Sequence, residues 1–246
     1  MQNELEQALE TVFPRLDLLS GQRIRHFYQL LLEEAPLLGL SGITDPREVA
    51  SKHILDCAFL GRALKEESLQ WNRLVDIGSG AGLPGIILGI LCPFLEEVVL
   101  VDSRNKAICW LKKVARDLGL ENVVPIQARA EEMGQGKERE SFDLVVTRAF
   151  GPLPLVLEYC VPLVRIGGTL IAMRGPAESS IEIREILHLL GARVIKETSY
   201  TLPWSMGKRK LLFIHKEQST PSSYPRPGGK AKKRPLVFHV KQYPNG

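Results

Sequence analysis

Glycines spaced for close approach to a ligand are the feature of this chain with the clearest chemistry. Three of them alternate with small residues directly after an apolar run that predicts a strand, and they are Gly78, Gly80 and Gly82. Glycine permits a sharp turn and lets the backbone approach a bound group where a Cβ would clash. Because such a loop between a strand and a helix typically holds a nucleotide-like cofactor, we expect one here.

A carboxylate follows the glycine loop at the spacing that is typical of a nucleotide-like cofactor site. Residues 98–102 form an apolar run that ends in Asp102, about 20 residues beyond the loop, where an acidic side chain can accept hydrogen bonds from ribose hydroxyls. Asp102 and Ser103 also precede a helical pattern, so capping of that helix is the alternative role. The pairing with the glycine loop favours the ribose role, and we assign both residues to the expected cofactor site.

The glycine loop fits two motifs that bind different cofactors. Counted from Gly78 it is G-x-G-x-G, and counted from Gly80 it is G-x-G-x-x-G ending in Gly85, the dinucleotide fingerprint. Gly78 directly ends the strand and Asp76 lies inside it, which favours the first motif. That form is similar to the S-adenosyl-L-methionine loop of Rossmann-like methyltransferases, whereas a glycine turn without a ligand is the plain alternative. The expected cofactor is therefore S-adenosyl-L-methionine.

Strands and helices alternate from residue 73 onward, which favours one parallel sheet. We expect five such strands and a closing antiparallel hairpin, at residues 73–77, 97–102, 123–127, 141–147, 169–173, 193–200 and 210–215. Helical spacing of apolar residues predicts the remaining elements, at 5–13, 23–38, 47–64, 83–91, 104–118, 153–164 and 178–190. The predicted fold class is α/β: a Rossmann-like class I methyltransferase sheet, mostly parallel, with an antiparallel C-terminal hairpin and an N-terminal helical cap.

Side chains after the third and fourth expected strands complete the candidate site. Ala130 and Glu131 follow the third strand, where Glu131 could accept from an adenine amino group; an acid facing a helix N-terminus is the alternative. Arg148 follows the fourth strand, beside the expected cofactor crevice. The sequence lacks the motif of amino-directed methyltransferases and the proline-preceded cysteine of cytosine-C5 enzymes. These patterns indicate an acceptor that needs neither covalent attack nor a tight amine clamp.

The composition indicates the cellular compartment of the protein and the state of its cysteines. The 246-residue chain has no apolar run near the roughly 20 residues of a membrane span, and its first residues are polar and acidic. Its four cysteines form no C-x-x-C pair, which predicts neither a zinc site nor a disulfide framework. We therefore expect a cytoplasmic monomer without membrane or metal partners.

The net charge of +4 conceals an asymmetry along the chain. Residues 203–246 contain ten Lys or Arg and one acid, a net charge of +9, which leaves −5 for the rest. We predict three regions: a helical cap at 1–72, a cofactor-binding methyltransferase domain at 73–216, and a basic extended tail at 217–246. The tail could meet a polyanion such as RNA, or its residues 224–226 could pack back onto the sheet as structure.

The combination of four segments resembles one known family. These are the glycine loop, the R-A-F sequence at 148–150, the H-I-L-D sequence at 53–56, and the segment TPSSYPRPGGKAKKRPL at 220–236. Together they are similar to the glucose-inhibited division protein B family, the bacterial small-subunit ribosomal RNA guanine-N7 methyltransferases. The resemblance implies that S-adenosylmethionine contacts Gly78, Leu83, Ala130, Glu131 and Arg148. For His53 and Asp56, three residues apart on one helix face, the favoured role is to pin the helical cap to the sheet.

The resemblance implies methylation of N7 of a guanine in 16S ribosomal RNA, with free RNA or the small-subunit particle as partner. Since N7 carries a free lone pair, catalysis would consist of positioning, and Arg148 is the expected catalytic residue. Arg148 and Arg174 are candidates to contact O6, and Phe150 or Trp204 to stack on the base. The alternatives are methylation of another RNA or of a small molecule, and a noncatalytic Rossmann-type protein that binds a nucleotide or RNA.

Overall fold

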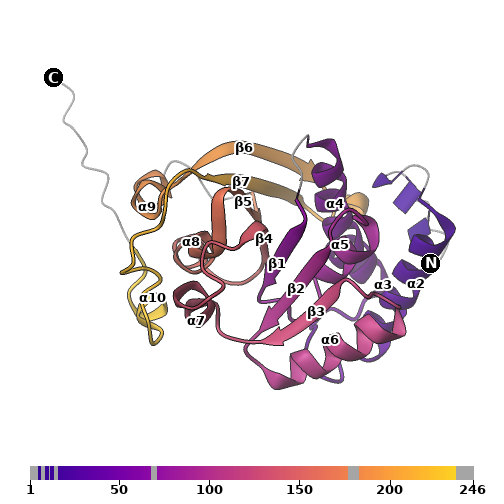
Figure 1. The fold of residues 1–246 in the computed structure, drawn as a ribbon. Coiled ribbons are helices and arrows are strands. Elements are labelled where there is room, and N and C mark those ends of the chain that lie inside the picture. Colours follow the sequence, from indigo (N-terminus) through magenta and orange to yellow (C-terminus); the bar gives the residue numbers. More distant parts are fainter. Residues whose placement is uncertain are drawn as a thin grey trace.

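The computed structural model describes residues 5–6, 9–10, 12–13, 16–67, 71–176 and 183–236. Within these residues the molecule is built on a seven-stranded sheet in the order β3-β2-β1-β4-β5-β7-β6 (Figure 1). The strands are β1 (Arg73–Ile77), β2 (Glu97–Asp102), β3 (Val123–Gln127), β4 (Phe142–Arg148), β5 (Val164–Arg174), β6 (Ala192–Thr201) and β7 (Lys208–Lys216). β1 to β5 run parallel, and β7 is antiparallel to both β5 and β6. The predicted class I methyltransferase fold is therefore confirmed.

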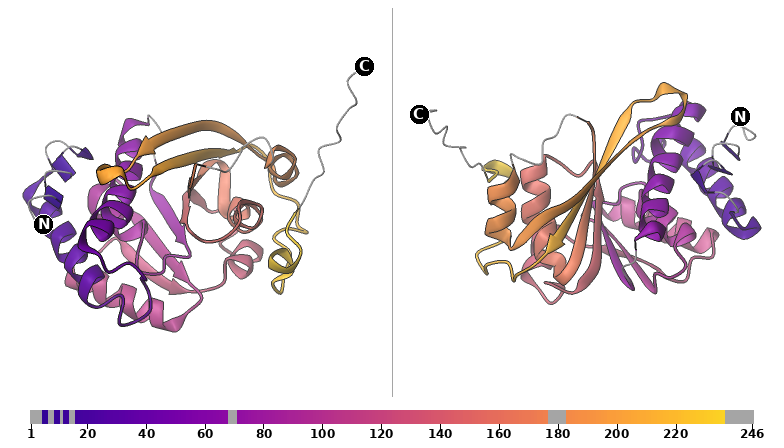
Figure 2. Two further views of the ribbon diagram at one scale, coloured as in Figure 1. Left: turned by 180° about the vertical axis from the view of Figure 1, so that it is seen from behind. Right: turned by 90° about the horizontal axis from the view of Figure 1, so that it is seen from above.

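Both faces are buried in the middle of the sheet, at β1, β2 and β4, which explains the nearly continuous apolar runs of these strands. Successive side chains of a strand point to opposite faces, so neighbouring residues enter different cores. Leu74 and Leu144 belong to the core on one face, and Val75 and Val145 to the core on the other. Figure 2 shows the two helical layers that cover these faces.

The helices that precede the sheet, together with α5 and α6, cover one of its faces. This layer contains α2 (Leu18–Glu33), α3 (Pro46–Glu48), the π-helix η1 (Val49–Leu55), α4 (Asp56–Glu66), α5 (Gly85–Leu91) and α6 (Asn105–Asp117). The helices before residue 73 share one hydrophobic core with the sheet. α2 begins five residues before the predicted 23–38 helix, because Asp17 accepts from the amide of Ser20 at 2.9 Å and caps it there. The helix predicted at 5–13 lies only partly within the described residues.

The opposite face carries shorter helices. They are α7 (Ala130–Gln135), α8 (Leu153–Cys160), the 3₁₀ turn η2 (Val161–Leu163) and α9 (Arg184–Leu190). α8 ends before the predicted limit at residue 164, because η2 takes over at Val161 and β5 already begins at Val164. The predicted helix at 178–190 is described only from residue 183 onward.

The C-terminal region folds back onto the molecule as far as the structure describes it. Its composition is typical of an extended segment, yet residues 217–236 contain α10 (Lys230–Lys233), which contacts α8. Thr220, Ala231 and Leu236 are buried there. Residues 237–246 of the predicted tail lie outside the described residues. The described part of the segment therefore packs against α8, whereas the second account placed residues 224–226 on the sheet.

The cysteines are unpaired in the structure. Cys57, Cys92 and Cys160 are buried, and Cys109 is exposed. In the part of the chain that is described, none of the helices combines the length and the apolar character that crossing a membrane requires.

Candidate functional site

The loop after β1 has the backbone conformation that its glycines allow. Gly78, Gly80 and Gly82 have φ angles of 77°, 55° and 104°, in a region that residues with a Cβ rarely adopt. A Cβ on Gly78 would lie 2.5 Å from the ring of Phe150. The amide of Gly78 donates to the carbonyl of Val101 at 2.9 Å, so the loop is joined to the end of β2. The turn therefore places backbone that carries no side chains at the carboxyl edge of the sheet.

Asp102 lies at the tip of β2 and organises this loop. Its carboxylate accepts from the amide of Gly80 at 3.1 Å and from the amide of Arg104 at 2.9 Å. The Arg104 guanidinium donates to both of its oxygens, at 3.0 and 3.1 Å. Burial raises the pKa of Asp102, but the hydrogen bonds from Arg104 outweigh it and hold the pKa below its ordinary value. Asp102 is therefore charged at neutral pH, which makes it a strong acceptor for ribose hydroxyls.

Asp76 joins the strand to the helix that follows the loop. It is fully buried, and its Oδ2 accepts from the amide of Gly85 at 3.0 Å. A Cβ on Gly85 would lie 2.1 Å from Leu100 and 2.9 Å from Asp76 Oδ2, so only glycine lets α5 approach β1 this closely. Burial raises the pKa of Asp76 to about 7. Asp76 thus shapes the loop from behind.

A cavity of about 340 Å³ lies at the carboxyl ends of the central strands, and we call it the first cavity. Its volume falls within the roughly 300–1,000 Å³ of small-molecule sites. It is lined by Ile77, Gly78, Val101, Asp102, Ser103, Arg104, Ala128, Arg129, Ala130, Glu131, Ala149, Phe150, Leu155, Tyr159, Gly229 and Lys232. Strand tips and the loops after them supply most of these residues, as expected for a ligand site in an open α/β sheet.

The predicted cofactor residues fall into four groups. Those that line the first cavity are Gly78, Asp102, Ser103, Ala130 and Glu131. Gly80 stands just behind them, with its amide on Asp102. Gly82 and Leu83 face the hydrophobic core: a Cβ on Gly82 would lie 2.7 Å from Ile86, and Leu83 is 4% exposed. Arg148 lies outside the first cavity.

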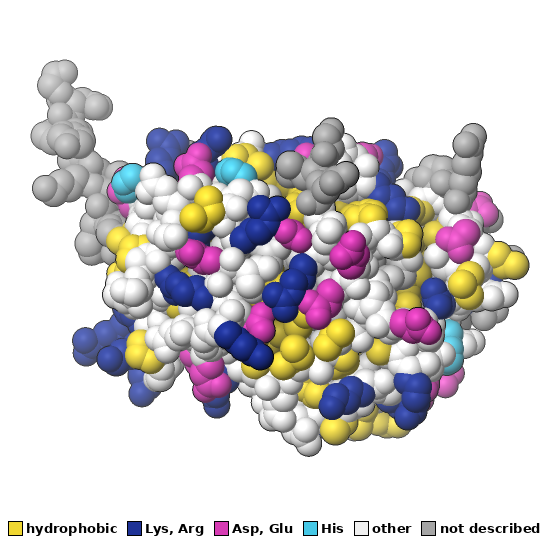
Figure 3. All heavy atoms as spheres, viewed as in Figure 1, with side chains coloured by type: hydrophobic (Ala, Val, Ile, Leu, Met, Phe, Trp, Pro, Cys, Tyr) yellow, Lys and Arg dark blue, Asp and Glu magenta, His cyan; other side chains and the backbone are white. Residues whose placement is uncertain are grey.

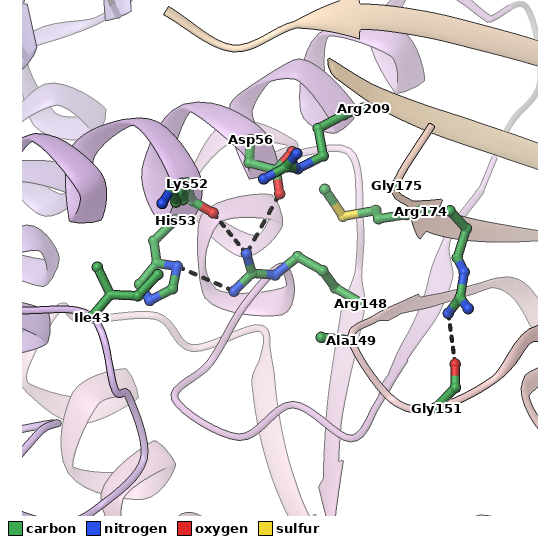
Figure 4. A pocket seen from close by; sticks show the side chains of 11 residues that line it. Ile43, Lys52, His53, Asp56, Arg148, Ala149, Gly151, Arg174, Gly175 and Arg209 are labelled. Carbon is green, nitrogen blue, oxygen red and sulfur yellow. Dashed lines mark hydrogen bonds and ion pairs between the residues drawn. The ribbon is translucent and has the colours of Figure 1, made fainter. Parts of the chain in front are cut away.

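Arg148 lines a neighbouring cavity of about 600 Å³, the second cavity, which Figure 4 shows. The two cavities share Ala149, which has a φ of 54° at the end of β4. The second cavity is lined by Ile43, Lys52, His53, Asp56, Arg148, Ala149, Gly151, Met173, Arg174, Gly175 and Arg209. Four of these side chains are Lys or Arg and one is an acid. This balance suits an anionic ligand.

Arg148 reaches from the sheet to the helical layer. Its Nη1 donates to the carbonyl of Lys52 at 2.7 Å and lies 3.5 Å from Asp56 Oδ2, while its Nη2 lies 3.4 Å from His53 Nδ1 (Figure 4). Lys52 and His53 belong to the π-helix η1, a helix type that is frequent at functional sites. His53 and Asp56 therefore pin the helical layer to β4, as the sequence predicted. Among the described atoms, Nε of Arg148 is buried without a hydrogen-bond partner.

Burial and the Arg148 charge set the protonation of this network. Burial first, and then the charge of Arg148, lower the pKa of His53 to about 4. His53 is therefore neutral at pH 7, and its Nδ1 can accept from Arg148. Burial raises the pKa of Asp56, although Arg148 opposes that shift. Tyr200 Oη donates to Asp56 Oδ1 at 2.7 Å, and Arg209 Nε lies 3.9 Å from the same oxygen, so the carboxyl group has partners from three strands.

Several residues of the two cavities did not stand out in the sequence. In the first cavity they are Arg104, Tyr159, Gly229 and Lys232, and in the second Lys52 and Arg209. Arg104 lies two residues after Asp102, so a possible charge pair was the one local sequence signal that could have identified it. Phe150 was a candidate for stacking on the base, but it lies against Gly78 in the first cavity.

The arrangement allows a transfer between two ligands. One ligand with a ribose fits beside Asp102, and an anionic partner fits beside Arg148, with Ala149 between them. Within the described ranges, no group of three or more His, Cys, Asp or Glu side chains is placed to hold a metal ion.

A family model and two relatives carry the same description. The family model GidB, rRNA small subunit methyltransferase G, matches residues 20–202. A ribosomal RNA small subunit methyltransferase G from Moorella thermoacetica is 41% identical over 217 residues, which cover 87% of this chain and 89% of that protein. One from Brevibacillus brevis is 39% identical over 220 residues, which cover 88% of this chain and 91% of that protein.

Solved structures resemble the chain in fold. The magnesium protoporphyrin IX methyltransferase from Synechocystis PCC 6803, with bound SAM, has a TM-score of 0.57 at 12% identity, covering 83% of this chain and 99% of that one. A branched-chain polyamine synthase from Thermus thermophilus has a TM-score of 0.54 at 12% identity, over 68% of this chain and 56% of that one. At these identities the likeness concerns the sheet and its helices.

Proposed function

The chain belongs to the rRNA small subunit methyltransferase G family and is an S-adenosylmethionine-dependent rRNA methyltransferase, and we propose that it methylates N7 of a guanine in 16S ribosomal RNA. The single observation that carries the proposal is that a nucleoside-sized cavity and a basic cavity meet at Ala149. The alternatives that the sequence left open, a small-molecule methyltransferase and a noncatalytic binding protein, find no support in these relatives.

We assign the cofactor to the first cavity. Its glycine cradle would hold the methionine part, the charged carboxylate of Asp102 would accept from the ribose, and the segment Ala130–Glu131 would meet the adenine. When bound, S-adenosylmethionine supplies an activated methyl group on a sulfonium. The fit rests on two observations. The positive φ of Gly78 lets the loop backbone turn beside the cavity, and the low pKa of Asp102 keeps its carboxylate charged for a ribose-bearing ligand.

The guanine is assigned to the second cavity. Its N7 already carries a lone pair, so the surrounding residues have no proton to remove and act by positioning. Arg148 and Arg174 can donate to the O6 acceptor beside N7. His53, neutral because of its low pKa, and Asp56 hold the Arg148 guanidinium in place. Arg148 is thus the proposed catalytic residue.

The partner is the 16S rRNA, free or in the small-subunit particle. Lys52, Arg148, Arg174 and Arg209 supply positive charge for its phosphates around the second cavity. We propose that the enzyme acts as a monomer and in the cytoplasm, where ribosomal subunits are made. The assignment predicts that cofactor binding and methyl transfer depend on different residues.

Arg148→Ala and Arg148→Lys test the assignment of the second cavity. Lysine keeps the charge but cannot reproduce the three contacts of the guanidinium. We expect methylation of 16S rRNA by both variants to fall about 100-fold or more, since small misplacements have effects of that size. Cofactor affinity, measured by calorimetry, should remain near that of the wild type, because Arg148 lies outside the first cavity.

The matched control is Arg165→Ala, which removes an arginine that pairs with Asp143 at the other end of the sheet. It should leave turnover unchanged. Mass mapping of the methylated RNA identifies the atom that accepts the methyl group. Turnover near the wild-type rate in both Arg148 variants would refute the role of Arg148, and a methyl group mapped to another position would refute the N7 assignment.

A further inference from the structure

The C-terminal region supplies one wall of the first cavity. Gly229 and Lys232 line it together with Glu131 and Tyr159, although 98 residues separate Glu131 from Gly229 in the sequence. All other lining residues come from the strand tips, the loops after them, α7 and α8. The matching family model covers residues 20–202, so it does not include this wall.

Buried contacts away from the cavity hold this wall in place. Glu158 on α8 is fully buried, and its carboxylate accepts from the amide of Arg226 at 2.9 Å and from its guanidinium at 2.7 and 2.6 Å. The Arg139 guanidinium donates to the carbonyl of Tyr224 at 2.7 Å. Ala231 is buried against the core below α8. The segment is therefore fixed at both ends of its crossing.

Between these anchors the chain reverses at two glycines. Gly228 and Gly229 have φ angles of 64° and 68°, and a Cβ on either would meet nothing within 4 Å. Backbone conformation, and not lack of space, is therefore the reason for glycine at both positions. The reversal turns α10 so that Ala231 faces the core while Lys232 borders the first cavity.

The same segment is the most basic stretch of the chain. Lys230, Lys232, Lys233 and Arg234 are exposed, and no acid occurs after Glu217. Figure 3 shows Lys and Arg side chains gathered over the region of α10. Such a cluster binds RNA phosphates through release of counterions.

We propose that residues 224–234, the C-terminal strap, close the adenosine end of the cofactor cavity, and that RNA phosphates bound to the strap hold it closed. The inference rests on the proposed function, because it takes S-adenosylmethionine as the cofactor and rRNA as the polyanion. One segment then serves both ligands: its inner side covers the cofactor and its outer side meets the phosphates. Each ligand should therefore raise the affinity for the other by the same factor.

Ala231→Asp and Lys233→Ala form a matched pair, since each lowers the charge of α10 by one. Only the aspartate would place a charge in the core and lift α10 away from α8. We expect Ala231→Asp to weaken S-adenosylmethionine binding about 10-fold, since burying an unpaired charge strongly disfavours the docked strap. Lys233→Ala should leave it unchanged. Tryptic cleavage within the strap reports its release, and near-UV circular dichroism reports the fold.

The coupling is measured by titrating S-adenosylmethionine with and without a 16S rRNA fragment. In the wild type RNA should raise cofactor affinity about 5-fold or more, and in Ala231→Asp this gain should vanish. A released strap with wild-type cofactor affinity would overturn the proposal. If Ala231→Asp does not fold, Lys232→Ala takes its place, and equal cofactor affinity in Lys232→Ala and Lys233→Ala would overturn it. A wild-type protein that binds no S-adenosylmethionine would instead refute the proposed function.

Discussion

At the scale of single residues, two carboxylates beside the glycine loop differ in ionisation because their partners differ. Asp102 receives the Arg104 guanidinium and two amides, and its pKa is below the ordinary value. Asp76 receives one amide in a fully buried setting, and its pKa rises to about 7. The charged carboxylate is the one that borders the first cavity, so charge is available where a ribose would need it.

Asp102→Ala should weaken S-adenosylmethionine binding by one to two orders of magnitude. The physical reason is the loss of hydrogen bonds to a charged group, which contribute about 1.5–3 kcal/mol. The matched control is Asp143→Ala: Asp143 also accepts from two amides, at 3.0 and 2.7 Å, and from an arginine, but at the opposite end of β4. Calorimetry should show weak binding for the first variant only. Equal affinities would reduce Asp102 to a structural acceptor.

His53 predicts a pH dependence of stability. Its pKa is about 4 in the fold and 6.5 in the unfolded chain, so between these values the unfolded state binds a proton that the native state does not. The contribution of neutral His53 to the free energy of unfolding is therefore present above pH 6.5 and is lost as the pH falls toward 4. Between pH 7.5 and 5 the wild type should lose about 2 kcal/mol more unfolding free energy than His53→Gln.

Urea unfolding of both proteins at the two pH values measures this difference. Comparison with the variant subtracts the effects of the other titrating groups on stability. Asp56 is one of them, and its raised pKa makes the fold more stable as the pH falls, opposite to the effect of His53. Parallel pH profiles for wild type and variant would mean that His53 is not held neutral by Arg148 and burial.

At the scale of elements, the site depends on how closely helices approach strand ends. α5 approaches β1 through Gly85, and the π-helix η1 brings Lys52 and His53 to the tip of β4. The strands alone place residues at one edge of the sheet, whereas these helix contacts decide which side chains face a cavity. Arg148 shows this, because its contacts with η1 and Asp56 direct it into the second cavity.

Gly85→Ala should destabilise the protein although it lies in a helix. Alanine is the better helix former by about 1 kcal/mol. The added Cβ, however, would meet buried Leu100 and Asp76 at 2.1 and 2.9 Å, and overpacking of a core costs about 1–3 kcal/mol. We expect a lower melting temperature and weaker cofactor binding. Gly42→Ala, with nothing within 4 Å of the new Cβ, should change neither, and a stable Gly85→Ala would show that α5 can shift freely.

At the scale of the whole molecule, charge and architecture are divided along the chain. Residues 203–246 carry +9 and the rest −5, but the basic region is not a separate appendage. The described part of it is anchored on α8 by the Glu158–Arg226 pair and borders the first cavity. An RNA contact and a structural contact therefore lie in the same segment.

Truncation after Glu217 should accordingly reduce thermal stability, cofactor affinity and RNA affinity together. It would leave Glu158 buried without its arginine, and loss of one partner of a buried pair costs about 3–5 kcal/mol. RNA affinity measured at two salt concentrations should also lose part of its salt dependence, by roughly 0.7–0.9 in slope per lost phosphate contact. Truncation after Leu236 keeps the strap and is the control. Loss of RNA affinity alone would show that the strap adds nothing to the cofactor cavity.

The sequence by itself determined the features that depend on neighbours along the chain. The strand, the glycine turn and Asp102 follow from local backbone preferences, and the alternation of elements was enough to predict the class I sheet. Asp102, Ser103, Ala130 and Glu131 could be assigned to one cavity because the carboxyl ends of parallel strands share one edge. The cofactor followed from the glycine-loop motif and the rRNA substrate class from the family resemblance, and the comparisons confirm both.

Only the tertiary structure decided how side chains divide between the two cavities and the core. Leu83 faces the core, Arg148 lines the second cavity, and Lys232 returns from the far end of the chain to border the first. Each outcome depends on contacts between residues distant in sequence, such as Arg148 with Asp56 or Arg226 with Glu158. A pattern of local spacing carries no information on which of several arginines or lysines meets a buried carboxylate, because desolvation and pairing are set by the assembled fold.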